Sequence, residues 1–233
     1  MSNCIVLCGF SNSGKSTSMK YLNPEETFIV SCTNKQLQIP GFRSKYKKVE
    51  VVNGELTGNW LVSSDYTKIG KILNAVSKLR PDIKVLVIDD INYLLSAQTF
   101  ADANTKGYEK FTILAKNYYD LISTCQNLRD DLTVVIISHI ENAGTELDPD
   151  LRLWTTGKML TNAVNLDGLF SYIIYAERLT SDDGTDEVIY KFRTRTNGND
   201  TCRSVAGCFE DKYIEPNLKD VIDRINEFEN GSL

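Results

Sequence analysis

Residues 9–16 read Gly9-Phe10-Ser11-Asn12-Ser13-Gly14-Lys15-Ser16, and this glycine-rich stretch decides the fold. It has the spacing G-x-x-x-x-G-K-S, follows the apolar run at residues 4–8 and precedes residues 17–22, so we predict strand, loop and helix in that order. The glycines let backbone N–H groups turn inward around a phosphate, and the N-terminus of the next helix attracts the same anion. The stretch predicts a nucleotide-binding loop of the Walker A type, the alternative being a glycine-rich turn with a solvated lysine.

The residues of this loop are the types that hold a triphosphate and its metal ion. Lys15 would reach the β- and γ-phosphates and stabilise the charge on the transferred phosphoryl group, and Ser16 would ligate Mg²⁺. The predicted cofactors are therefore ATP and Mg²⁺. The predicted cofactor-binding residues are Gly9, Asn12, Ser13, Gly14, Lys15, Ser16 and Thr17.

A second apolar run supplies a carboxylate for the same site. Residues 85–90 read Val-Leu-Val-Ile-Asp-Asp, which is typical of a buried parallel strand that delivers an acid to the ligand edge of a sheet. We predict that Asp89 completes the Mg²⁺ shell beside Ser16, as a Walker B aspartate does. The alternative for Asp89 is a cap for the helix that begins at the following residues.

A histidine ends another predicted strand. Residues 133–138 form an apolar run that is followed directly by His139 and soon by Glu141. Because polar groups at the carboxyl ends of core strands face the ligand, His139 is a candidate sensor that hydrogen-bonds the γ-phosphate or the attacking water. The alternative is a strand-end histidine that is satisfied within the protein.

Length and pattern favour one α/β domain over residues 1–233, with a mostly parallel sheet flanked by helices. The pattern places a further core strand at 27–32, an added hairpin or edge strands at 49–52 and 60–62, and loops at 96–107 and 142–157. Helices are expected at 65–79, 108–128 and 218–228. Residues 169–177 and 188–193, joined through 181–184, predict a C-terminal antiparallel hairpin.

Composition limits the partners and the location. The net charge is −5, so a nucleic-acid surface would be a local basic patch; one candidate, otherwise a solvated face, is the cluster Arg43, Lys45, Lys47 and Lys48. We find no apolar run of transmembrane length and no signal peptide before the first strand, so we expect no membrane partner and a cytoplasmic location, which is the host cytoplasm if a phage encodes the chain. The six cysteines show no C-x-x-C pair and predict reduced, buried thiols.

Five motifs together resemble one family. They are residues 9–16, 85–90, 136–139, 155–160 (Thr-Thr-Gly-Lys-Met-Leu) and 197–201 (Asn-Gly-Asn-Asp-Thr). The chain resembles the short bacteriophage ATPases of the RecA-like class that act as Sak-type single-strand annealing proteins, which are related to RecA and Rad recombinases. The first two motifs occur in very many P-loop enzymes, whereas the other three are more particular. The resemblance extends from Cys4 to Phe228.

This resemblance implies a RecA-like P-loop NTPase core in which the acidic strand is not adjacent to the loop strand. It also implies ATP hydrolysis stimulated by single-stranded DNA, DNA annealing or recombination, assembly of identical subunits into a ring or filament, and a single-strand-binding protein as a further partner. Loops 100–107 and 141–157 correspond to the two DNA-binding loops of recombinases. Within them and at their edges, the candidate DNA contacts are Lys106, Tyr108, Arg152 and Trp154.

Two sets of catalytic residues follow from the same resemblance. Lys158, Arg193 and Arg195 are similar in position to basic residues that such proteins offer to a neighbouring subunit's ATP, although a solvated role explains each equally well. Larger recombinases place a glutamate just after the second core strand, where this chain has Ser-Cys-Thr-Asn at 31–34. Asp90 and Glu141 are the nearest substitutes for that base, and the catalytic candidates are therefore Lys15, Asp90, His139 and Glu141.

Two other classes of function remain open from the sequence. A small-molecule or nucleotide kinase needs the same phosphate loop, together with an acceptor pocket and an arginine-bearing lid. A nucleotide-switched, DNA-associated assembly factor with little hydrolysis would explain the missing glutamate.

Overall fold

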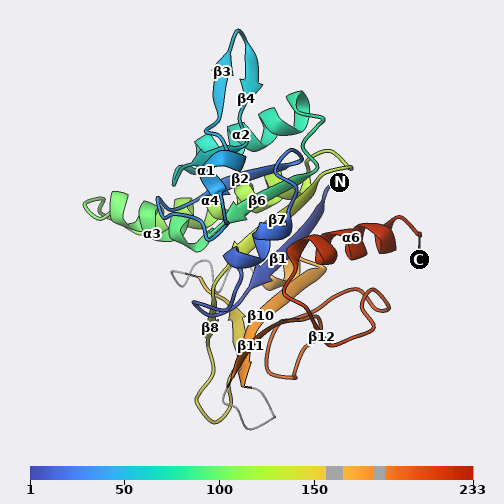
Figure 1. The fold of residues 1–233 in the computed structure, drawn as a ribbon. Helices are drawn as coiled ribbons and strands as arrows, with labels where there is room; N and C mark the ends of the chain where they lie inside the picture. Colours follow the sequence, from blue (N-terminus) through green and yellow to red (C-terminus); the bar gives the residue numbers. More distant parts are fainter. Residues whose placement is uncertain (156–164, 181–186, 233) are drawn as a thin grey trace.

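A computed structural model describes residues 1–155, 165–180 and 187–232 of the chain (Figure 1). Its strands are β1 Asn3–Cys8, β2 Thr27–Ser31, β3 Glu50–Val52, β4 Glu55–Thr57, β5 Trp60–Val62, β6 Val85–Asp89, β7 Thr133–Ser138, β8 Ile140–Asn142, β9 Leu151–Leu153, β10 Tyr172–Thr180, β11 Val188–Arg193 and β12 Tyr213–Ile214. Its helices are η1 Ser16–Tyr21, α1 Phe42–Lys45, α2 Tyr66–Leu79, α3 Asn92–Ala101, α4 Glu109–Gln126, η2 Asp167–Leu169 and α6 Leu218–Glu229.

One mixed sheet forms the centre of the molecule. In the described residues its order is β12-β11-β10-β1-β7-β6-β2-β5, in which the run from β10 to β5 is parallel and β11 and β12 are antiparallel additions. This confirms the predicted α/β fold with a mostly parallel sheet and a C-terminal antiparallel hairpin. Strand β7 separates β1 from β6, so the acidic strand is not adjacent to the loop strand, as a RecA-like core requires.

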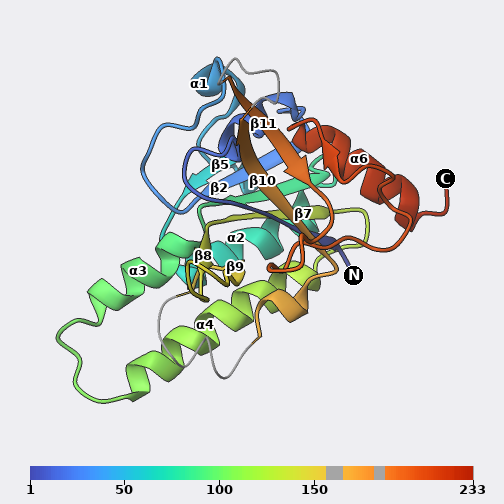
Figure 2. The ribbon, with the colours of Figure 1, turned by 90° about the horizontal axis from the view of Figure 1, so that it is seen from below.

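Helices cover both faces of this sheet (Figure 2). On one face, α2, α3 and α4 pack against a cluster that includes Ile69, Leu73 and Leu121. On the other face, η1, α1 and α6 pack against a second cluster that includes Met19, Phe42 and Ile222. The continuous apolar runs of the central strands follow from this arrangement, because each strand is buried on both sides.

Two of the predicted helices, α2 and α6, begin at residues whose side chains cap them. Asp65 accepts a hydrogen bond from the backbone N–H of Lys68 and starts α2, which ends just before Pro81. Asn217 caps α6 in the same way, and α6 buries an apolar stripe formed by Leu218, Val221, Ile222 and Ile225. The helix after the phosphate loop differs from the expectation because it is a six-residue 3₁₀ helix, η1.

Both expected loops contain regular structure, which corrects the prediction for 96–107 and 142–157. Helix α3 continues to Ala101, so the connection before α4 begins at Asp102. Strands β8 and β9 form a small hairpin, in which Glu141 pairs with Arg152. Sequence periodicity missed the hairpin because each of its strands is only three residues long.

The hairpin near residue 50 also differs in detail from the expectation. β3 pairs with β4 across Asn53 and Gly54, which both have positive φ, whereas β5 joins the edge of the main sheet beside β2. The predicted turn at 181–184 between β10 and β11 lies outside the described residues.

The cysteines match the prediction of free thiols. None of the six forms a disulfide; Cys4 is partly buried and the others are buried. Burial raises the pKa of Cys4, Cys8 and Cys32 well above the usual value and that of Cys125 to about 12. Within the described part of the chain, no His, Cys, Asp and Glu side chains group together as a metal site, and no helix is long and apolar enough to cross a bilayer.

Candidate nucleotide-binding site

The loop between β1 and η1 wraps around the side chain of Lys15. Its ammonium Nζ donates to the carbonyl oxygens of Gly9 and Phe10, each at 2.8 Å, and approaches Ser13 Oγ at 3.4 Å. A Cβ at position 9 would lie 2.4 Å from the carbonyl oxygen of Ala176 on β10, so this position accepts only glycine. Gly14 has φ +90°, a conformation that glycine adopts without strain.

Lys15 is a buried cation that has no carboxylate partner among the described ion pairs. Its side chain is only 5% exposed, and its hydrogen-bond acceptors are neutral oxygens. Burial is the main cause that lowers the pKa of Lys15 to about 8, while the nearby carboxylates Asp90 and Asp89 raise it. An anion in the loop would offset more of the cost of burying this charge.

Ser16 and Asp89 meet at the same edge of the sheet. Ser16 Oγ donates to Asp89 Oδ1 at 3.0 Å, and Asp89 is fully buried. The second oxygen of this carboxylate, Oδ2, has no hydrogen-bond partner. Burial is the main cause that raises the pKa of Asp89 to about 6, and repulsion from Asp90 adds to it. A hydroxyl beside a carboxylate with a free oxygen fits Mg²⁺, which prefers oxygen ligands.

Asp90 follows β6 in a left-handed backbone conformation, with φ +60°. Its carboxylate forms an ion pair with Lys35 through Oδ2, and its Oδ1 lies 3.6 Å from His139 Nε2. Burial works against the charge of Lys35, but the hydrogen bond to Asp90 and the charge of Asp89 raise its pKa above the usual value. Strained backbone at the end of a core strand is often found at functional sites.

Asn92 fixes the position of His139. Its Oδ1 accepts hydrogen bonds from His139 N at 2.7 Å and from Ser138 Oγ at 3.0 Å, while its Nδ2 donates to Trp154 O at 2.6 Å. Burial is the main cause that lowers the pKa of His139, and the charge of Lys15 adds to it. The lowered pKa favours the neutral imidazole. A neutral imidazole at this point can donate to a phosphate oxygen or to a water molecule.

A cavity of about 230 Å³ lies between the glycine-rich loop, Asp90 and His139, and two residues of the predicted site, Gly9 and Asp89, are not among those that line it. Its lining includes most of the predicted site: Asn12, Ser13, Gly14, Lys15, Ser16, Thr17, Asp90 and His139. It also includes Lys35, Gln36, Gln38 and Tyr93, which the sequence reasoning missed. The signal that would have found the first three is their position just after β2, because carboxyl ends of parallel strands share one edge.

A second cavity of about 370 Å³ adjoins the first through Tyr93 and His139. Phe10 and Trp154 contribute aromatic rings to it, and none of the described residues that line it is lysine or arginine.

Several predicted residues lie away from the phosphate cavity. Glu141 does not line it and instead faces Arg152, whose Nε lies 3.9 Å from Glu141 Oε1. Lys106 and Tyr108 lie at the tip of the arm formed by α3 and α4, where Tyr108 is 89% exposed (Figures 1 and 2). Trp154 is half-buried and donates its backbone N–H to His139 O at 2.9 Å. Of the two candidate bases, the structure therefore brings only Asp90 to the cavity.

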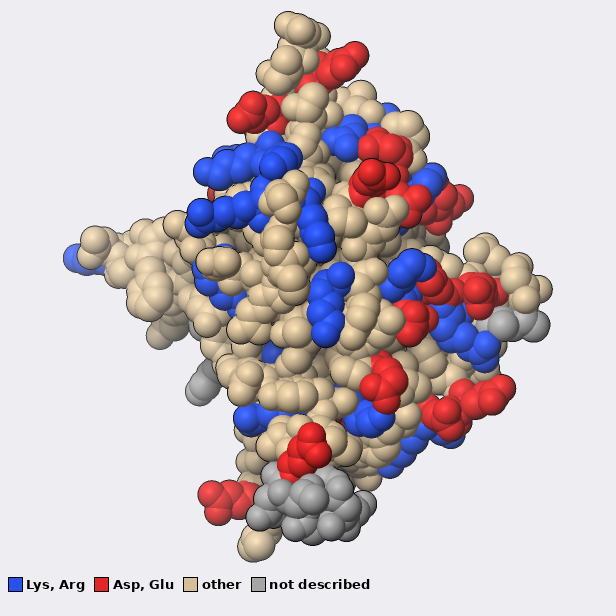
Figure 3. All heavy atoms as spheres, viewed as in Figure 1, with Lys and Arg blue, Asp and Glu red and all other residues tan. Residues whose placement is uncertain are grey.

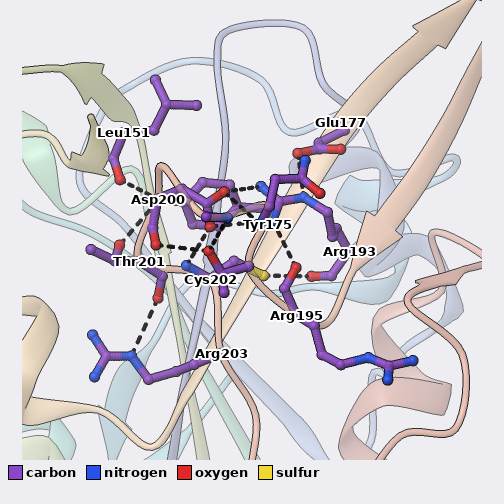
Figure 4. A network of polar contacts seen from close by, with 12 residues as sticks. Leu151, Tyr175, Glu177, Arg193, Arg195, Asp200, Thr201, Cys202 and Arg203 are labelled. Atoms are coloured by element: carbon purple, nitrogen blue, oxygen red, sulfur yellow. Dashed lines mark hydrogen bonds and ion pairs between the residues drawn. The ribbon is translucent and has the colours of Figure 1, made fainter. Parts of the chain in front are cut away.

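Arg193 is the centre of a buried network and does not fit a role at a neighbour's ATP (Figure 4). It is 1% exposed; its Nε lies 2.7 Å from Glu177 Oε1, and its Nη2 lies 3.0 Å from Asp200 Oδ2. A side chain that reaches another subunit must be exposed, so we correct this candidate to a structural residue. Arg195 is exposed and donates to Glu210 O at 2.6 Å, and Lys158 lies outside the described residues.

The same network gives a structural explanation for the motif at 197–201. Asp200 accepts hydrogen bonds from the backbone of Asn197 and Cys202 in addition to its ion pair with Arg193. Thr201 Oγ1 donates to Asp167 Oδ1 at 2.7 Å and lies 3.1 Å from the hydroxyl of Tyr175 (Figure 4). The motif thus connects β11 to the β8–β9 hairpin, because Leu151 on β9 also donates to Asn199 O.

The strand order, the phosphate loop and the Ser16–Asp89 contact together define a P-loop NTPase fold. No family model matches the chain, and a search of curated proteins finds no relative. Among solved structures, the chain is similar to the genome packaging NTPase B204 from Sulfolobus turreted icosahedral virus 2 in complex with ATPγS. The identity is 13%, the match covers 79% of this chain and 78% of that chain, and the TM-score is 0.38. At these values the fold assignment depends on the topology and loop geometry described above.

Proposed function

We propose that the protein is an ATPase that binds ATP with Mg²⁺ in the cavity beside β1 and β6. The observation that carries this proposal is the buried ammonium of Lys15, which the carbonyl oxygens of Gly9 and Phe10 hold inside the glycine-rich loop and which has no ion pair among the described residues. A triphosphate would compensate that charge, and Ser16 and Asp89 would hold the metal ion, which withdraws charge from the phosphate oxygens.

The other residues of the cavity take the remaining roles in this proposal. His139 would donate a hydrogen bond to the γ-phosphate or the attacking water, held in place by Asn92. Asp90 would accept a proton from that water, because it is the candidate base that lines the cavity. This role requires Lys35 to move from Asp90 toward the phosphates.

The first experiment measures ATP affinity and hydrolysis in the Lys15→Ala variant. We expect turnover to fall at least about 100-fold, because an electrostatic contact to the transferred group is removed. Lys68→Ala is the matched control. Lys68 is an exposed lysine on α2, which packs on the face of the sheet opposite η1. Unchanged hydrolysis in Lys15→Ala would contradict the proposed site.

We also propose that single-stranded DNA is the macromolecular partner and that the protein anneals or recombines it, as the resemblance to Sak-type proteins implies. The test compares ATP hydrolysis, subunit association and annealing of complementary strands with and without single-stranded DNA. Faster hydrolysis with DNA supports the proposal. If Lys15→Ala anneals strands as well as the wild type in the presence of ATP, annealing is not coupled to the nucleotide.

One observation favours a second candidate, a nucleotide switch with little hydrolysis. Lys35 already pairs with Asp90, and residues 31–34, where larger recombinases carry a glutamate, are Ser-Cys-Thr-Asn in this chain. A base that remains paired with a cation is a weak base. Negligible turnover with every DNA tested, together with tight ATP binding, would support the switch over the ATPase.

A further inference from the structure

The segment between β2 and β3 carries the densest positive charge of the chain. Residues 33–48 contain Lys35, Arg43, Lys45, Lys47 and Lys48 and no acidic residue, although the whole protein has a net charge of −5. All five side chains are exposed. Apart from the pair of Lys35 with Asp90, no described ion pair joins them to a carboxylate.

The apolar residues of this segment hold the basic ones outward. Phe42 and Tyr46, one turn apart across α1, are buried and stack at a ring distance of 5.1 Å, and Phe42 also packs edge-on against Trp60. Figure 3 shows Lys and Arg side chains gathered over the part of the face that carries α1 and η1. The acidic side chains in that view lie at the β3–β4 hairpin, along the side of α6 and in the lower part of the molecule. The positive surface is therefore fixed by the fold.

The neighbouring helix η1 adds a group suited to unpaired bases. Tyr21 is 46% exposed, and the ammonium of Lys20 lies 4.7 Å from the centre of its ring. η1 packs in the same core cluster as α1, through Met19. Exposed aromatic rings stack with single-stranded bases, whose faces are covered in a duplex.

The loops that the family resemblance assigns to DNA carry the opposite charge or none. Residues 141–157 contain four carboxylates and one arginine, and residues 100–107 contain one aspartate and one lysine. Phosphate contacts supply most of the affinity of a protein for nucleic acid, and lysine and arginine make them. The charges of the molecule therefore favour α1 and η1 over those loops.

We infer that the basic surface of α1 and η1, formed by Lys20, Arg43, Lys45, Lys47 and Lys48 with Tyr21, is the site where single-stranded DNA contacts this protein. The inference rests on the proposed DNA partner and names its surface. The segment that carries α1 also lines the phosphate cavity with Lys35, Gln36 and Gln38, and Gln38 accepts a hydrogen bond from Thr17 Oγ1 at 3.0 Å. One continuous segment of the chain would thus contact both the nucleotide in the cavity and the bound single-stranded DNA.

The test uses two triple variants with equal charge changes. One replaces Arg43, Lys45 and Lys48 by glutamine on α1 and just after it, and the other replaces Lys68, Lys71 and Lys78 by glutamine on α2, on the opposite face. Fluorescence anisotropy of a labelled oligo(dT) gives the affinity at several salt concentrations, with and without ATPγS and Mg²⁺. Hydrolysis without DNA and thermal unfolding show whether each variant is folded.

We expect the α1 variant to bind oligo(dT) at least tenfold more weakly at about 0.1 M salt. The slope of log affinity against log salt should fall by about 2, because each lost phosphate contact contributes about 0.7. The α2 variant should bind as the wild type does. Tyr21→Ala should weaken binding at least about fivefold with an unchanged salt slope, whereas Tyr108→Ala at the arm tip should have no effect.

Two results would overturn the inference, one by excluding this surface and the other by excluding the DNA partner. If the wild type binds oligo(dT) and the α1 variant binds equally well, or no worse than the α2 variant, the surface is wrong while the DNA partner stands. If the wild type binds no single-stranded DNA with any nucleotide, the proposed DNA partner fails and the inference fails with it.

Discussion

Lys35 and Asp90 form an ion pair inside the phosphate cavity, although they follow different strands, β2 and β6. Both strands end at the same edge of the sheet, where Ser31 is paired with Asp89. The cavity therefore contains two cations, Lys15 and Lys35, only one of which belongs to the glycine-rich loop. Lys35 has a carboxylate partner, whereas Lys15 has none among the described ion pairs.

Replacement of Lys35 tests whether this second cation contributes to nucleotide binding. We expect Lys35→Ala to weaken ATP binding about five- to tenfold, because a charge-assisted contact to phosphate is worth about 1–1.5 kcal/mol more than a contact to water. Lys35→Arg keeps the charge and should stay within about threefold of the wild type. Titration with a fluorescent ATP analogue gives both affinities. Equal affinity in Lys35→Ala and wild type would show that Lys35 pairs only with Asp90.

Asn92 should be needed for both stability and turnover. Asn92→Ala leaves the backbone N–H of His139 and the hydroxyl of Ser138 without their shared acceptor, so we expect a loss of about 1–3 kcal/mol in the free energy of unfolding. We also expect slower hydrolysis, since His139 is no longer held. Asn74→Ala on α2 is the control, because Asn74 is exposed and should change stability by less than about 0.5 kcal/mol. Urea unfolding and ATPase assays measure the two effects; a stable variant with full activity would refute the positioning role.

His139 should make the protein less stable in mild acid. Its pKa is lowered by burial below the ordinary 6.5, so the unfolded chain binds this proton at a higher pH than the folded chain. The free energy of unfolding therefore falls as the pH drops through and below 6.5. Asp89 has the opposite effect on stability. Because its pKa is raised to about 6 in the folded chain, the folded chain takes up this proton first, and the free energy of unfolding rises as the pH falls from about 6 to about 4.

A comparison with His139→Gln separates these two effects, because His139 is the only histidine of the chain. Urea unfolding at pH 7.5 and 5.5 should show that the wild type loses stability relative to the variant as the pH falls. A constant difference between the two proteins across this range would contradict the lowered pKa.

Arg193 should be essential for folding of the single subunit. Arg193→Ala would leave Glu177 and the nearly fully buried Asp200 without their cation, which typically costs about 3–5 kcal/mol. Arg195→Ala, at an exposed arginine two residues away, should cost less than about 1 kcal/mol. Thermal unfolding of the two variants checks this difference. A stable Arg193→Ala protein that loses only subunit-dependent hydrolysis would restore the role at a neighbour's ATP.

The sequence predicts the parts of the site that lie on long, strongly apolar strands. The runs before Gly9, Asp89 and His139 are buried on both faces, so their order and their final polar residues could be predicted from pattern alone. Their meeting at one edge follows from parallel pairing. The contact between Ser16 and Asp89 is therefore the prediction that the structure supports most directly.

Residues whose roles depend on distant partners could not be predicted in the same way. Lys35 lies in an irregular segment and Asn92 is the first residue of α3, and their partners, Asp90 and Ser138, are 55 and 46 positions away. In the sequence, Arg193 alternates with Lys191 on β11 and with Arg195 just beyond it, a pattern that predicts one shared face for the three side chains. The structure buries Arg193 because Asp200 and Glu177 approach from other segments, and no local pattern reports such contacts.

The high pKa values of the native thiols make the chain suitable for site-specific labelling. Thiolates react with maleimides far faster than thiols do, and burial keeps the six native cysteines protonated and largely covered. A single cysteine introduced at Lys45 or Tyr108 could therefore carry a fluorophore without prior removal of the others. Such a probe would report directly which of the two regions changes its surroundings when an oligonucleotide arrives.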